Sequence, residues 1–574
     1  MRFLFSYLKK YRLVSILAPL FKMLEASFEL LIPLIVRQMI DVGLSGGGDK
    51  AYILTRVGLL ALFAFVGMAA AITAQFFSAK AAVGVATDLR AGLFSHVLSL
   101  SPKDTNALGA STLMTRLTGD VNAVQNGVNL TLRLLLRSPF VVFGAWAMAY
   151  TVDPATAGVF SAAVPLLALI VAGVMAVTTP LYRKVQAKLD GVTLSVRENL
   201  TGARVIRAFG REDREKEDFR QKAEAHFRLA FRAGRLSSLL GPATYVVVNL
   251  AVILLIHIGA VRVNGGLITR GAVVAQYNYF AQILVELVKF ANLVVSVSKG
   301  LAGAKRVEAV MALQPSLTFP EKGASPDLSA PALELRNAGL TYYEGAAPAV
   351  TDLTLTVRAG QTVGLVGGTG AGKSSVLRLM SRLYDATEGE VLLFGHGIKD
   401  YDEATLRSLV AVVEQKSVLF AGSIEEELRR ACPEASDSAV KEALVASQSL
   451  SVIEAKPEGL STLIEQGGRN FSGGQRQRLA LAKALVRRTP VLLLDDVCSA
   501  LDNATARALT QALKSLSWRP TVVLTAQRSA PLKNCETVCV LEDGKITAMG
   551  DRDALLAQSE AFRFICDAER GLNA

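Results

Sequence analysis

Cysteine and histidine are scarce in this chain. Its 574 residues include five cysteines and four histidines. The cysteines form no CxxC pair, and no histidine stands near them at the spacing of a zinc site. All five lie in the C-terminal half, at Cys432, Cys498, Cys535, Cys539 and Cys566. This usage argues against a zinc module or a disulfide-rich secreted domain, and it favours reduced cytosolic thiols.

We also expect no cleavable N-terminal leader. The first apolar stretch is interrupted by Lys22 and Glu25, and no small-residue cleavage pattern follows it. We therefore expect this stretch to stay in the protein as a helix.

Hydrophobic residues, in contrast, are abundant, at 51% of the chain with a mean hydropathy of +0.36. They gather in long runs within the first 300 residues or so, whereas the last 240 or so alternate as in a soluble α/β domain. The net charge of +12 fits either nucleic acid or cytoplasmic loops beside a membrane. The apolar runs favour the membrane, so we expect the lipid bilayer and no nucleic acid as a partner.

Six segments have the length and apolarity of a bilayer-spanning helix. They cover about residues 13–40, 52–78, 136–152, 156–178, 240–262 and 272–298. The connections on one side are short, at Ser45–Lys50, Thr151–Pro154 and Asn264–Arg270, whereas residues 181–236 are long and rich in Arg and Lys. The positive-inside tendency places the N-terminus, both long loops and the C-terminal domain in the cytoplasm. The long loops are expected to be membrane helices that continue into the cytosol.

Two pairs of opposite charges lie inside the expected spans, Lys22 with Glu25 and Glu286 with Lys289. Charges in hydrocarbon are costly and indicate a polar cavity. The three-residue spacing also fits a self-neutralising pair on one helix face. The sequence leaves both interpretations open.

The organisation of the chain follows from these patterns. We expect residues 1–314 to form an all-α, polytopic membrane domain with six transmembrane helices that extend into the cytosol. The Pro-rich segment 315–331 reads as a linker. Strand signals begin at Leu333, and residues 332–574 alternate strands with helices, as an α/β nucleotide-binding domain does.

A phosphate-binding loop is the strongest chemical signal. It reads Gly367, Gly368, Thr369, Gly370, Ala371, Gly372, Lys373 and Ser374, with Ser375 continuing into a helix. The apolar strand Thr362–Val366 precedes it, which is the context that GxxxxGK[ST] requires. Backbone N–H groups and the helix end would cradle phosphates, Lys373 would reach the β/γ-phosphates, and Ser374 would ligate Mg²⁺.

A second apolar strand, Val491–Leu494, ends in Asp495. An apolar strand followed by an aspartate is common, but downstream of a P-loop it has the Walker B form. Asp495 is therefore expected to hold the magnesium shell, and the cofactors are expected to be ATP and Mg²⁺.

Between these motifs stand Ser472, Gly473, Gly474 and Gln475, followed by a basic helix. This arrangement resembles the signature motif of ATP-binding cassette (ABC) proteins. In that family the signature binds the γ-phosphate of ATP held by the opposite subunit, again through a helix N-terminus.

Further elements resemble the same family. Tyr342 is similar to the aromatic residue that stacks on adenine, Gln415 to the Q-loop glutamine that touches Mg²⁺, and Asp502 to the end of the D-loop. Residues 115–121 and 198–209 look like the intracellular loops of type IV, exporter-fold members, whose loop tips dock on the ATP-binding domains. The resemblance spans almost the whole chain and implies a half-transporter in a bacterial plasma (inner) membrane.

Two positions depart from the family pattern. Asp496 stands where the family has the glutamate that polarises the attacking water, and Gln527 stands where it has a switch histidine. Aspartate is one methylene shorter, and glutamine cannot carry an imidazolium charge. We therefore expect this chain's Walker side to bind ATP and to hydrolyse it slowly, as in the degenerate-site subunit of heterodimeric bacterial multidrug exporters. The expected partner is a distinct ABC half-transporter with the Glu and the His.

The resemblance implies ATP-driven export of a small amphipathic or hydrophobic substrate, such as a drug or a lipid. Aliphatic and aromatic side chains in the spans, among them Phe77, Tyr245 and Phe290, agree with this. The sequence also admits an exporter-fold importer of metal chelates, a homodimeric exporter, and a regulatory subunit that binds ATP without transporting.

Overall fold

The computed structural model describes residues 2–44 and 49–571. The chain divides into two compact units. The helical unit comprises Met1–His96 and Ser111–Leu313, and the α/β unit comprises Val97–Ala110 and Gln314–Ala574.

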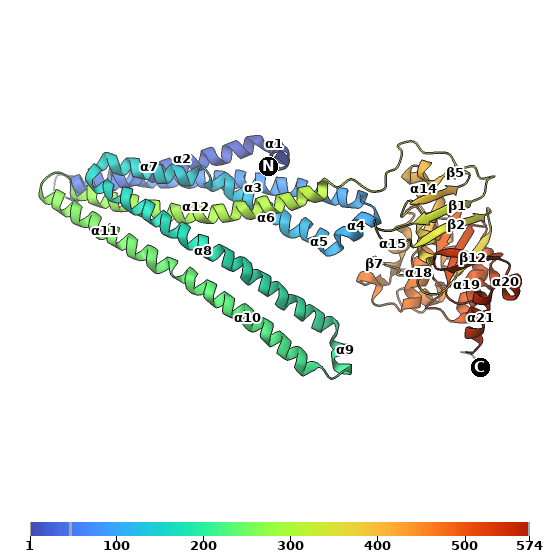
Figure 1. Cartoon of the computed structure of the whole chain (residues 1–574). Coiled ribbons are helices and arrows are strands. Elements are labelled where there is room, and N and C mark those ends of the chain that lie inside the picture. The colour runs from blue at the N-terminus through green and yellow to red at the C-terminus, as the bar shows by residue number, and fades with distance from the viewer. Residues whose placement is uncertain (1, 45–48, 572–574) are drawn as a thin grey trace. The chain divides into compact units, whose positions relative to one another are not determined.

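Helices build the helical unit, and several of them are long (Figure 1). They are α1 (Arg2–Lys10), α2 (Arg12–Gln38), α3 (Lys50–Ser99), α5 (Ala110–Thr115), α6 (Val121–Leu134), α7 (Arg137–Val152), α8 (Pro154–Thr201), α9 (Ala203–Ala208), α10 (Glu212–Ser238), α11 (Leu240–Asn264) and α12 (Arg270–Met311). The short turns at Thr151–Pro154 and Asn264–Arg270 lie where the sequence predicts them, whereas the turn at Ser45–Lys50 falls largely outside the described residues. As expected, α3 and α8 run far beyond the length of a span.

Five helical stretches of the described chain are long and apolar enough to cross a membrane. They are Lys50–Ser99, Ala110–Val152, Pro154–Thr201, Glu212–Asn264 and Arg270–Met311. The expected span 13–40 is not among them, although α2 is a continuous helix there. The physical reason is charge, because Lys22, Glu25 and Glu29 lie within its apolar stretch.

Helices α6 and α12 approach each other closely through glycine. A Cβ atom on Gly300 of α12 would lie 3.1 Å from the carbonyl oxygen of Ala123 and 3.3 Å from Cα of Gly127, both on α6. One turn along, a Cβ on Gly303 would lie 2.9 Å from the carbonyl oxygen of Asp120. The side chain of Asp120 accepts hydrogen bonds from Arg116 and from Arg306 of α12. The Asp120–Arg306 ion pair therefore joins the two segments at the end of the glycine contact.

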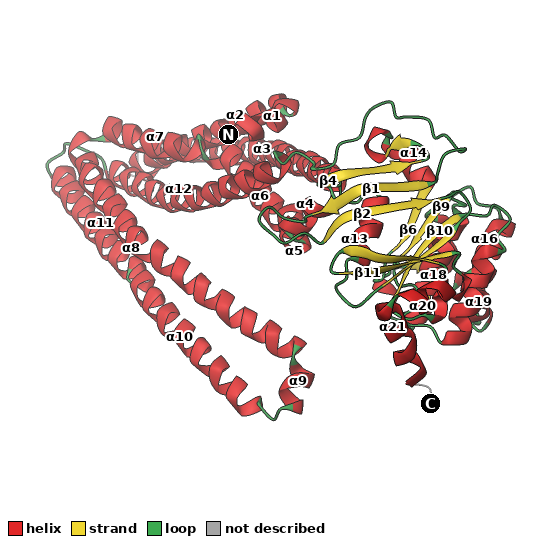
Figure 2. Cartoon of the chain, turned by 45° about the vertical axis from the view of Figure 1, so that its right-hand side comes forward, coloured by secondary structure: helices red, strands yellow, loops and turns green. Residues whose placement is uncertain are grey.

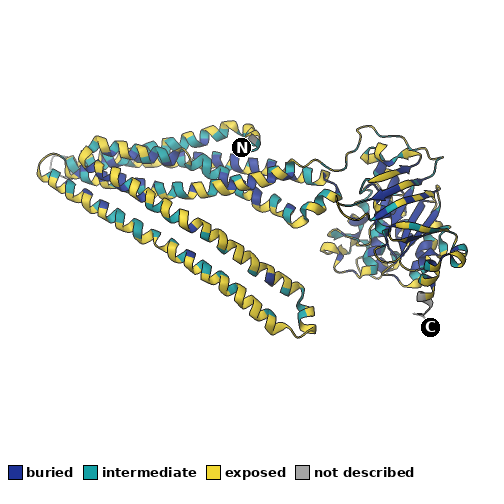
Figure 3. Ribbon diagram, in the orientation of Figure 1, coloured by how far each residue is buried: buried dark blue, intermediate teal, exposed yellow. Residues whose placement is uncertain are grey.

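Helices α8 and α10 form a long hairpin in the helical unit. Figure 1 shows α9 at the turn where the chain reverses from α8 into α10. The hairpin is largely exposed on its own, as Figure 3 shows, and Ala233 is the one buried residue of α10 in the described chain. Leu200, Val205 and Phe209 near the turn are strongly exposed apolar residues.

A six-stranded sheet forms the centre of the α/β unit (Figure 2). Its strand order is β12 (Lys545–Gly550), β11 (Thr537–Glu542), β3 (Thr362–Val366), β10 (Thr521–Ala526), β9 (Val491–Leu494) and β6 (Val410–Val413). The pairs from β11 to β6 are parallel, and β12 is antiparallel. A second sheet has the order β2 (Val350–Val357), β1 (Leu333–Leu340), β4 (Glu388–Leu393) and β5 (His396–Gly397).

Parallel order brings the carboxyl ends of β3, β6, β9 and β10 to one edge of the sheet. Strands β3, β9 and β10 are buried along their whole length. This rigid edge is where a ligand of an open α/β sheet is expected to bind. It carries the P-loop, Gln415, Asp495, Asp496 and Gln527.

The remaining helices of the α/β unit cover the sheets and form a separate helical layer. They are α4 (Pro102–Leu108), α13 (Lys373–Met380), α14 (Glu403–Leu409), α15 (Ile424–Arg429), α16 (Asp437–Ala446), α17 (Leu450–Glu454), α18 (Gly473–Val486), α19 (Asn503–Lys514), α20 (Arg552–Gln558) and α21 (Glu560–Gly571). A short ribbon of β7 (Gly422–Ser423) and β8 (Leu463–Ile464) completes the unit.

Segment 315–331 is anchored on the α/β unit by specific contacts. The guanidinium of Arg382 donates to the carbonyl oxygen of Thr318 at 2.7 Å and lies 4.4 Å from the ring centre of Phe319. Ser316 donates through its amide to Asp104, whose side chain also completes the capping box of α4. The segment is irregular, as its prolines predict, but it is bound at several points.

Candidate functional site

The P-loop connects β3 to α13 and needs its glycines. Gly370 and Gly372 have φ values of +87° and +97°, a region that favours glycine. A Cβ on Gly367 would lie 2.3 Å from the carbonyl oxygen of Leu541, and one on Gly372 would lie 2.6 Å from Cγ1 of Val350. The loop can therefore hold its tight curve only with these glycines. Its backbone is left free to approach a phosphate closely.

Lys373 lies folded back over this loop. Its Nζ donates to the carbonyl oxygens of Gly367 and Gly368, each at 2.8 Å. Burial lowers the pKa of Lys373, while the carboxylates of Asp496 and Asp495 oppose that shift. An anionic phosphate in the loop would supply the counter-charge that two neutral carbonyls do not.

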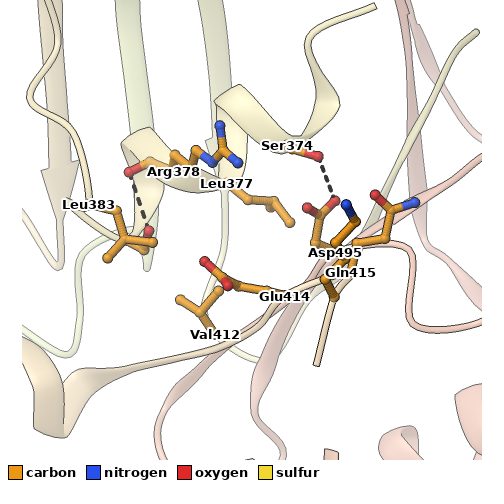
Figure 4. A pocket seen from close by; sticks show the side chains of 10 residues that line it. Ser374, Leu377, Arg378, Leu383, Val412, Glu414, Gln415 and Asp495 are labelled. Carbon is orange, nitrogen blue, oxygen red and sulfur yellow. Dashed lines mark hydrogen bonds between the residues drawn. The ribbon is translucent and has the colours of Figure 1, made fainter. Parts of the chain in front are cut away.

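The three residues expected to hold magnesium lie together. Ser374 Oγ donates to Oδ1 of Asp495 at 3.0 Å, and both line a cavity of about 360 Å³ with Gln415 (Figure 4). Thr525 Oγ1 donates to the same Asp495 oxygen at 2.8 Å, which fixes its orientation. One carboxylate with a hydroxyl and an amide oxygen suits an ion that also binds substrate phosphates. These residues therefore fit Mg²⁺ with a nucleotide.

Asp496 is held by two carboxamides. Nε2 of Gln415 donates to Oδ2 of Asp496 at 3.1 Å, and Nε2 of Gln527 donates to the same oxygen at 3.0 Å. Its backbone amide donates to Thr525 Oγ1 at 2.9 Å, and its φ of +47° lies in the left-handed region. Aspartate tolerates this conformation better than most residues do. The carboxylate is thus buried and bound from two sides.

The protonation of Asp496 follows from these surroundings. Burial raises its pKa, and the neighbouring charge of Asp495 raises it further. Lys373 and the two carboxamides act in the opposite direction without cancelling the rise. A carboxylate with this raised pKa has some of the basicity that a general base needs.

A second cavity of about 240 Å³ brings most of the expected site residues together. It is lined by Thr369, Gly370, Gly372, Lys373, Ser374, Ser375, Gln415, Asp495, Asp496 and Gln527. These residues come from four segments that are far apart in the sequence. Asp496 and Gln527 therefore line the same cavity as the P-loop residues.

The residues that resemble the ABC signature form a helix start of their own. Ser472 caps α18, and its side chain and that of Gln475 form a reciprocal capping box. Gly474 packs closely on the chain that follows Asp496, since a Cβ there would lie 2.8 Å from the carbonyl oxygen of Ala500. The side chain of Asp502 caps α19 by accepting hydrogen bonds from the backbone amides of Ala504 and Thr505, without a reciprocal capping box. None of these residues lines either cavity described above.

Tyr342 lies beside the helix that follows the P-loop. Its hydroxyl is 2.9 Å from Oγ of Ser375 and accepts a hydrogen bond from Arg378 at 2.9 Å. Its ring meets that of Tyr384 edge-on, with ring centres 4.9 Å apart. The proposed stacking on adenine remains a prediction.

Sequence reasoning missed Thr525 and Gln477. Thr525 orients Asp495 and binds the amide of Asp496, and only its place at the end of β10 pointed to it. Gln477 is buried on α18 and donates to the carbonyl oxygen of Gln415 at 3.4 Å and to Ser499 Oγ at 3.3 Å. The signal for Gln477 was its position two residues after Gln475.

Two family models match this chain. Residues 15–287 match the ABC transporter transmembrane region, and residues 350–499 match the ABC transporter model. An ABC transporter ATP-binding protein of Mycobacterium tuberculosis, described as uncharacterized, is 31% identical over 97% of this chain and 96% of its own length. This chain belongs to the ABC transporter family. It is accordingly an integral membrane protein with an ATP-binding domain.

Other similar proteins extend the comparison. The Bacillus subtilis ABC transporter ATP-binding protein YfiB, also described as uncharacterized, is 28% identical over 99% of this chain and 98% of its own length. An ATP-dependent lipid A-core flippase of Haemophilus influenzae is 29% identical over 83% of this chain and 82% of its own. A solved bacterial Atm1-family ABC exporter with ATP bound has a TM-score of 0.80, at 22% identity, over 97% of this chain and 98% of that one. The expected exporter fold is thereby confirmed.

Proposed function

We propose that this ABC transporter chain is one half of a heterodimeric, ATP-driven exporter and that its own Walker side forms a slowly hydrolysing ATP site. The single observation that carries the proposal is the Asp496 arrangement. A short carboxylate stands where the family has Glu, and a neutral carboxamide, Gln527, stands where it has His. Both substitutions affect hydrolysis rather than binding.

The geometry explains why hydrolysis would suffer. Oδ2 of Asp496 already accepts two hydrogen bonds, from Gln415 and Gln527, and such bonds stabilise the carboxylate without moving it toward a substrate. Gln527 can donate a hydrogen bond but cannot become cationic or relay a proton. The raised pKa of Asp496 supplies basicity, yet a base about 1 Å too far away loses about a hundredfold in rate.

Binding of ATP with Mg²⁺ draws on groups that are intact. Bound Mg²⁺ would neutralise phosphate charge, and Ser374, Gln415 and Asp495 are the residues we propose to hold it. The P-loop amides, Thr369, Lys373 and the start of α13 would orient the phosphates. Tyr342 would lie against the adenine.

The signature of this chain is suited to serve a partner. The capping box at Ser472 fixes the start of α18, and the first N–H groups of that helix are the donors that an anion can bind. We propose that this helix end completes the strong ATP site of a second, different half-transporter. That partner would carry the Glu and the His that this chain lacks.

The membrane setting completes the proposal. The chain would lie in a bacterial inner membrane, with its N-terminus and ATP-binding domain in the cytoplasm, because the long basic segments are on that side of the spans. The curated relatives named lipid A-core flippases favour an amphipathic, lipid-like substrate. Transport measured in vesicles of known orientation would separate export from the import of metal chelates.

The test measures ATP hydrolysis by the reconstituted pair of half-transporters, with single substitutions in this chain. The partner is identified as the ABC half-transporter that co-purifies with this chain. Ser472→Ala should reduce ATP hydrolysis by the pair strongly, because it damages the helix end offered to the partner's site. Asp496→Ala should reduce it less than about twofold, because the weak site contributes little turnover. Ser423→Ala is the matched control, since Ser423 caps α15 with the same kind of capping box.

Three results would refute the proposal. Brisk hydrolysis by this chain alone would show that its own site is competent. An effect of Asp496→Ala as large as that of Ser472→Ala would show that the two sites are equivalent. An equal loss with Ser423→Ala would show that Ser472 acts on stability only.

A further inference from the structure

An ion network joins three helices of the helical unit. Arg137, at the start of α7, forms ion pairs with Glu286 of α12 and with Glu29 of α2, the second at 2.6 Å. Lys289 also forms an ion pair with Glu286, at 2.8 Å, and the hydroxyl of Ser138 donates a hydrogen bond to the Glu286 carboxylate at 2.9 Å. Two positive and two negative side chains thus form one neutral cluster. Sequence reasoning found only its Glu286–Lys289 part.

Such a cluster is costly inside a membrane protein. Charges within a span are expensive, and a buried ion pair often adds no more stability than apolar side chains of the same volume would. The Nε atom of Arg137 is buried and has no hydrogen-bond partner among the described residues. Holding helices together is therefore a weak reason for these charges, and a ligand is a better one.

The cluster has an inner and an outer half. The side chains of Arg137 and Glu286 are 5% and 3% exposed, whereas those of Glu29 and Lys289 are 38% and 43% exposed. Glu29 and Lys289 therefore present one carboxylate and one ammonium on neighbouring helices. Each can make further hydrogen bonds, since a carboxylate accepts about four and an ammonium donates three. Charged side chains within membrane spans almost always face the bundle interior or a water-filled cavity, so we expect these two to line a polar cavity rather than to face lipid.

The depth of the cluster suits a headgroup from the inner leaflet. Arg137 precedes the end of α7 at Val152 by fifteen residues, about 22 Å along the helix. Lys289 follows the start of α12 at Arg270 by nineteen residues, about 28 Å. The hydrocarbon core is about 30 Å thick, so in the orientation proposed above the cluster lies near the cytoplasmic side. Exposed Val285 and Val288 flank Lys289 and offer an apolar surface for a tail.

We propose that Glu29 and Lys289 form a recognition site for the headgroup of a zwitterionic amphiphile, a molecule with one cation and one anion on a hydrophobic tail. The neutral cluster holds no excess charge to attract a simple cation or a simple anion. A zwitterion satisfies both outer groups at once, with its ammonium on Glu29 and its phosphate or carboxylate on Lys289. The inference rests on the proposed function, because it names the substrate class of that exporter.

Three probes with one tail and different headgroups test the site. They are dodecylphosphocholine, dodecyltrimethylammonium and dodecyl phosphate, each added below its micellar concentration to the full chain in neutral dodecyl maltoside. Native mass spectrometry counts the bound probes. We expect the phosphocholine probe to bind at least about tenfold more tightly than the other two. It alone combines a hydrogen bond from Lys289 to its phosphate with an ion pair between Glu29 and its trimethylammonium group, which has no N–H to donate.

Substitutions should move this preference in opposite directions. Lys289→Met should shift it toward the trimethylammonium probe, and Glu29→Gln should shift it toward the phosphate probe. Lys289→Arg keeps the charge and should keep the preference. Lys299→Met, an exposed lysine on the same helix, is the matched control and should leave the preference unchanged.

The inference is overturned if the full chain does not discriminate among the three probes. It is also overturned if Lys289→Met and Glu29→Gln lower thermal stability but leave the preference unchanged, which is the behaviour of a purely structural ion network. If either variant does not fold, the Lys289→Arg comparison and the wild-type preference still decide. The readout needs no ATP, so the headgroup site and the slow ATP site can fail independently.

Discussion

Restoring the two missing groups should reactivate this chain's own ATP site, but only when both are restored. The perturbation is Asp496→Glu with Gln527→His, compared with each single substitution. In the structure, Gln527 Nε2 lies 3.0 Å from Oδ2 of Asp496, so the two positions are in direct contact and their effects should not add.

The expected magnitude follows from the geometry. One methylene advances the carboxylate by at most about 1.5 Å, the length of a C–C bond. A misplacement of about 1 Å costs about a hundredfold, which is about 2.7 kcal/mol in the activation free energy. Asp496→Glu alone should recover less than about tenfold, because Gln527 still binds the carboxylate and carries no charge. The double variant should gain at least about a hundredfold.

The assay is steady-state ATP hydrolysis by the purified full chain in nanodiscs that hold two copies. The wild-type chain and both single variants should remain slow, and the double variant should be fast. Full recovery with Asp496→Glu alone would refute the view that two defects are present. Brisk hydrolysis by the wild-type chain would refute the slow-site assignment itself.

Three further outcomes are expected. Lys373→Ala should weaken binding of a fluorescent ATP analogue at least about tenfold, because its ammonium lies over the phosphate loop, whereas Lys441→Ala, an exposed change on α16, should not. Gly300→Ala should lower the melting temperature and reduce the free energy of unfolding by about 1 kcal/mol or more, because the added Cβ would press on the backbone of α6. The control Gly67→Ala adds a Cβ that meets no neighbour, so it should be neutral or stabilising. Asp496→Asn should stabilise the nucleotide-free chain against heat, increasingly as pH rises. Folding raises the pKa of this carboxyl, so its stabilising contribution is complete below the ordinary aspartate pKa and is lost as pH rises through the folded pKa; a pH-independent difference in melting would contradict this cause.

Most of the fold could be predicted from the sequence because local signals were strong. The apolar runs and short turns located the spanning helices, and the strands at Thr362–Val366 and Val491–Leu494 stand where their apolar runs predicted them. The span 13–40 was predicted from overall apolarity, and the charges within it make α2 less apolar than a typical span. The contacts of segment 315–331 could not be predicted, because its prolines show only that it is irregular.

Part of the site could likewise be predicted from the sequence, and part could not. The P-loop and Asp495 could be predicted from residue types at fixed spacing, because phosphate and Mg²⁺ binding require those residues at those positions. The shared hydrogen-bond acceptor on Asp496 depends on how β6, β9 and β10 lie beside one another, and local sequence does not fix this. Arg137 was overlooked for a related reason. It stands at the edge of an apolar run and looks like an end charge until Glu29 and Glu286 are seen beside it.

The anchoring of segment 315–331 has a practical consequence for biochemistry. A soluble ATPase fragment cut at the first strand, near Leu333, would discard Ser316, Thr318 and Phe319 and would leave Arg382, a buried guanidinium, without its carbonyl and its aromatic cover. Such a fragment should be prone to aggregate for reasons unrelated to its chemistry. One that begins near Gln314 keeps the contacts of Arg382 with Thr318 and Phe319, and it would give a fairer account of how this domain handles nucleotide by itself.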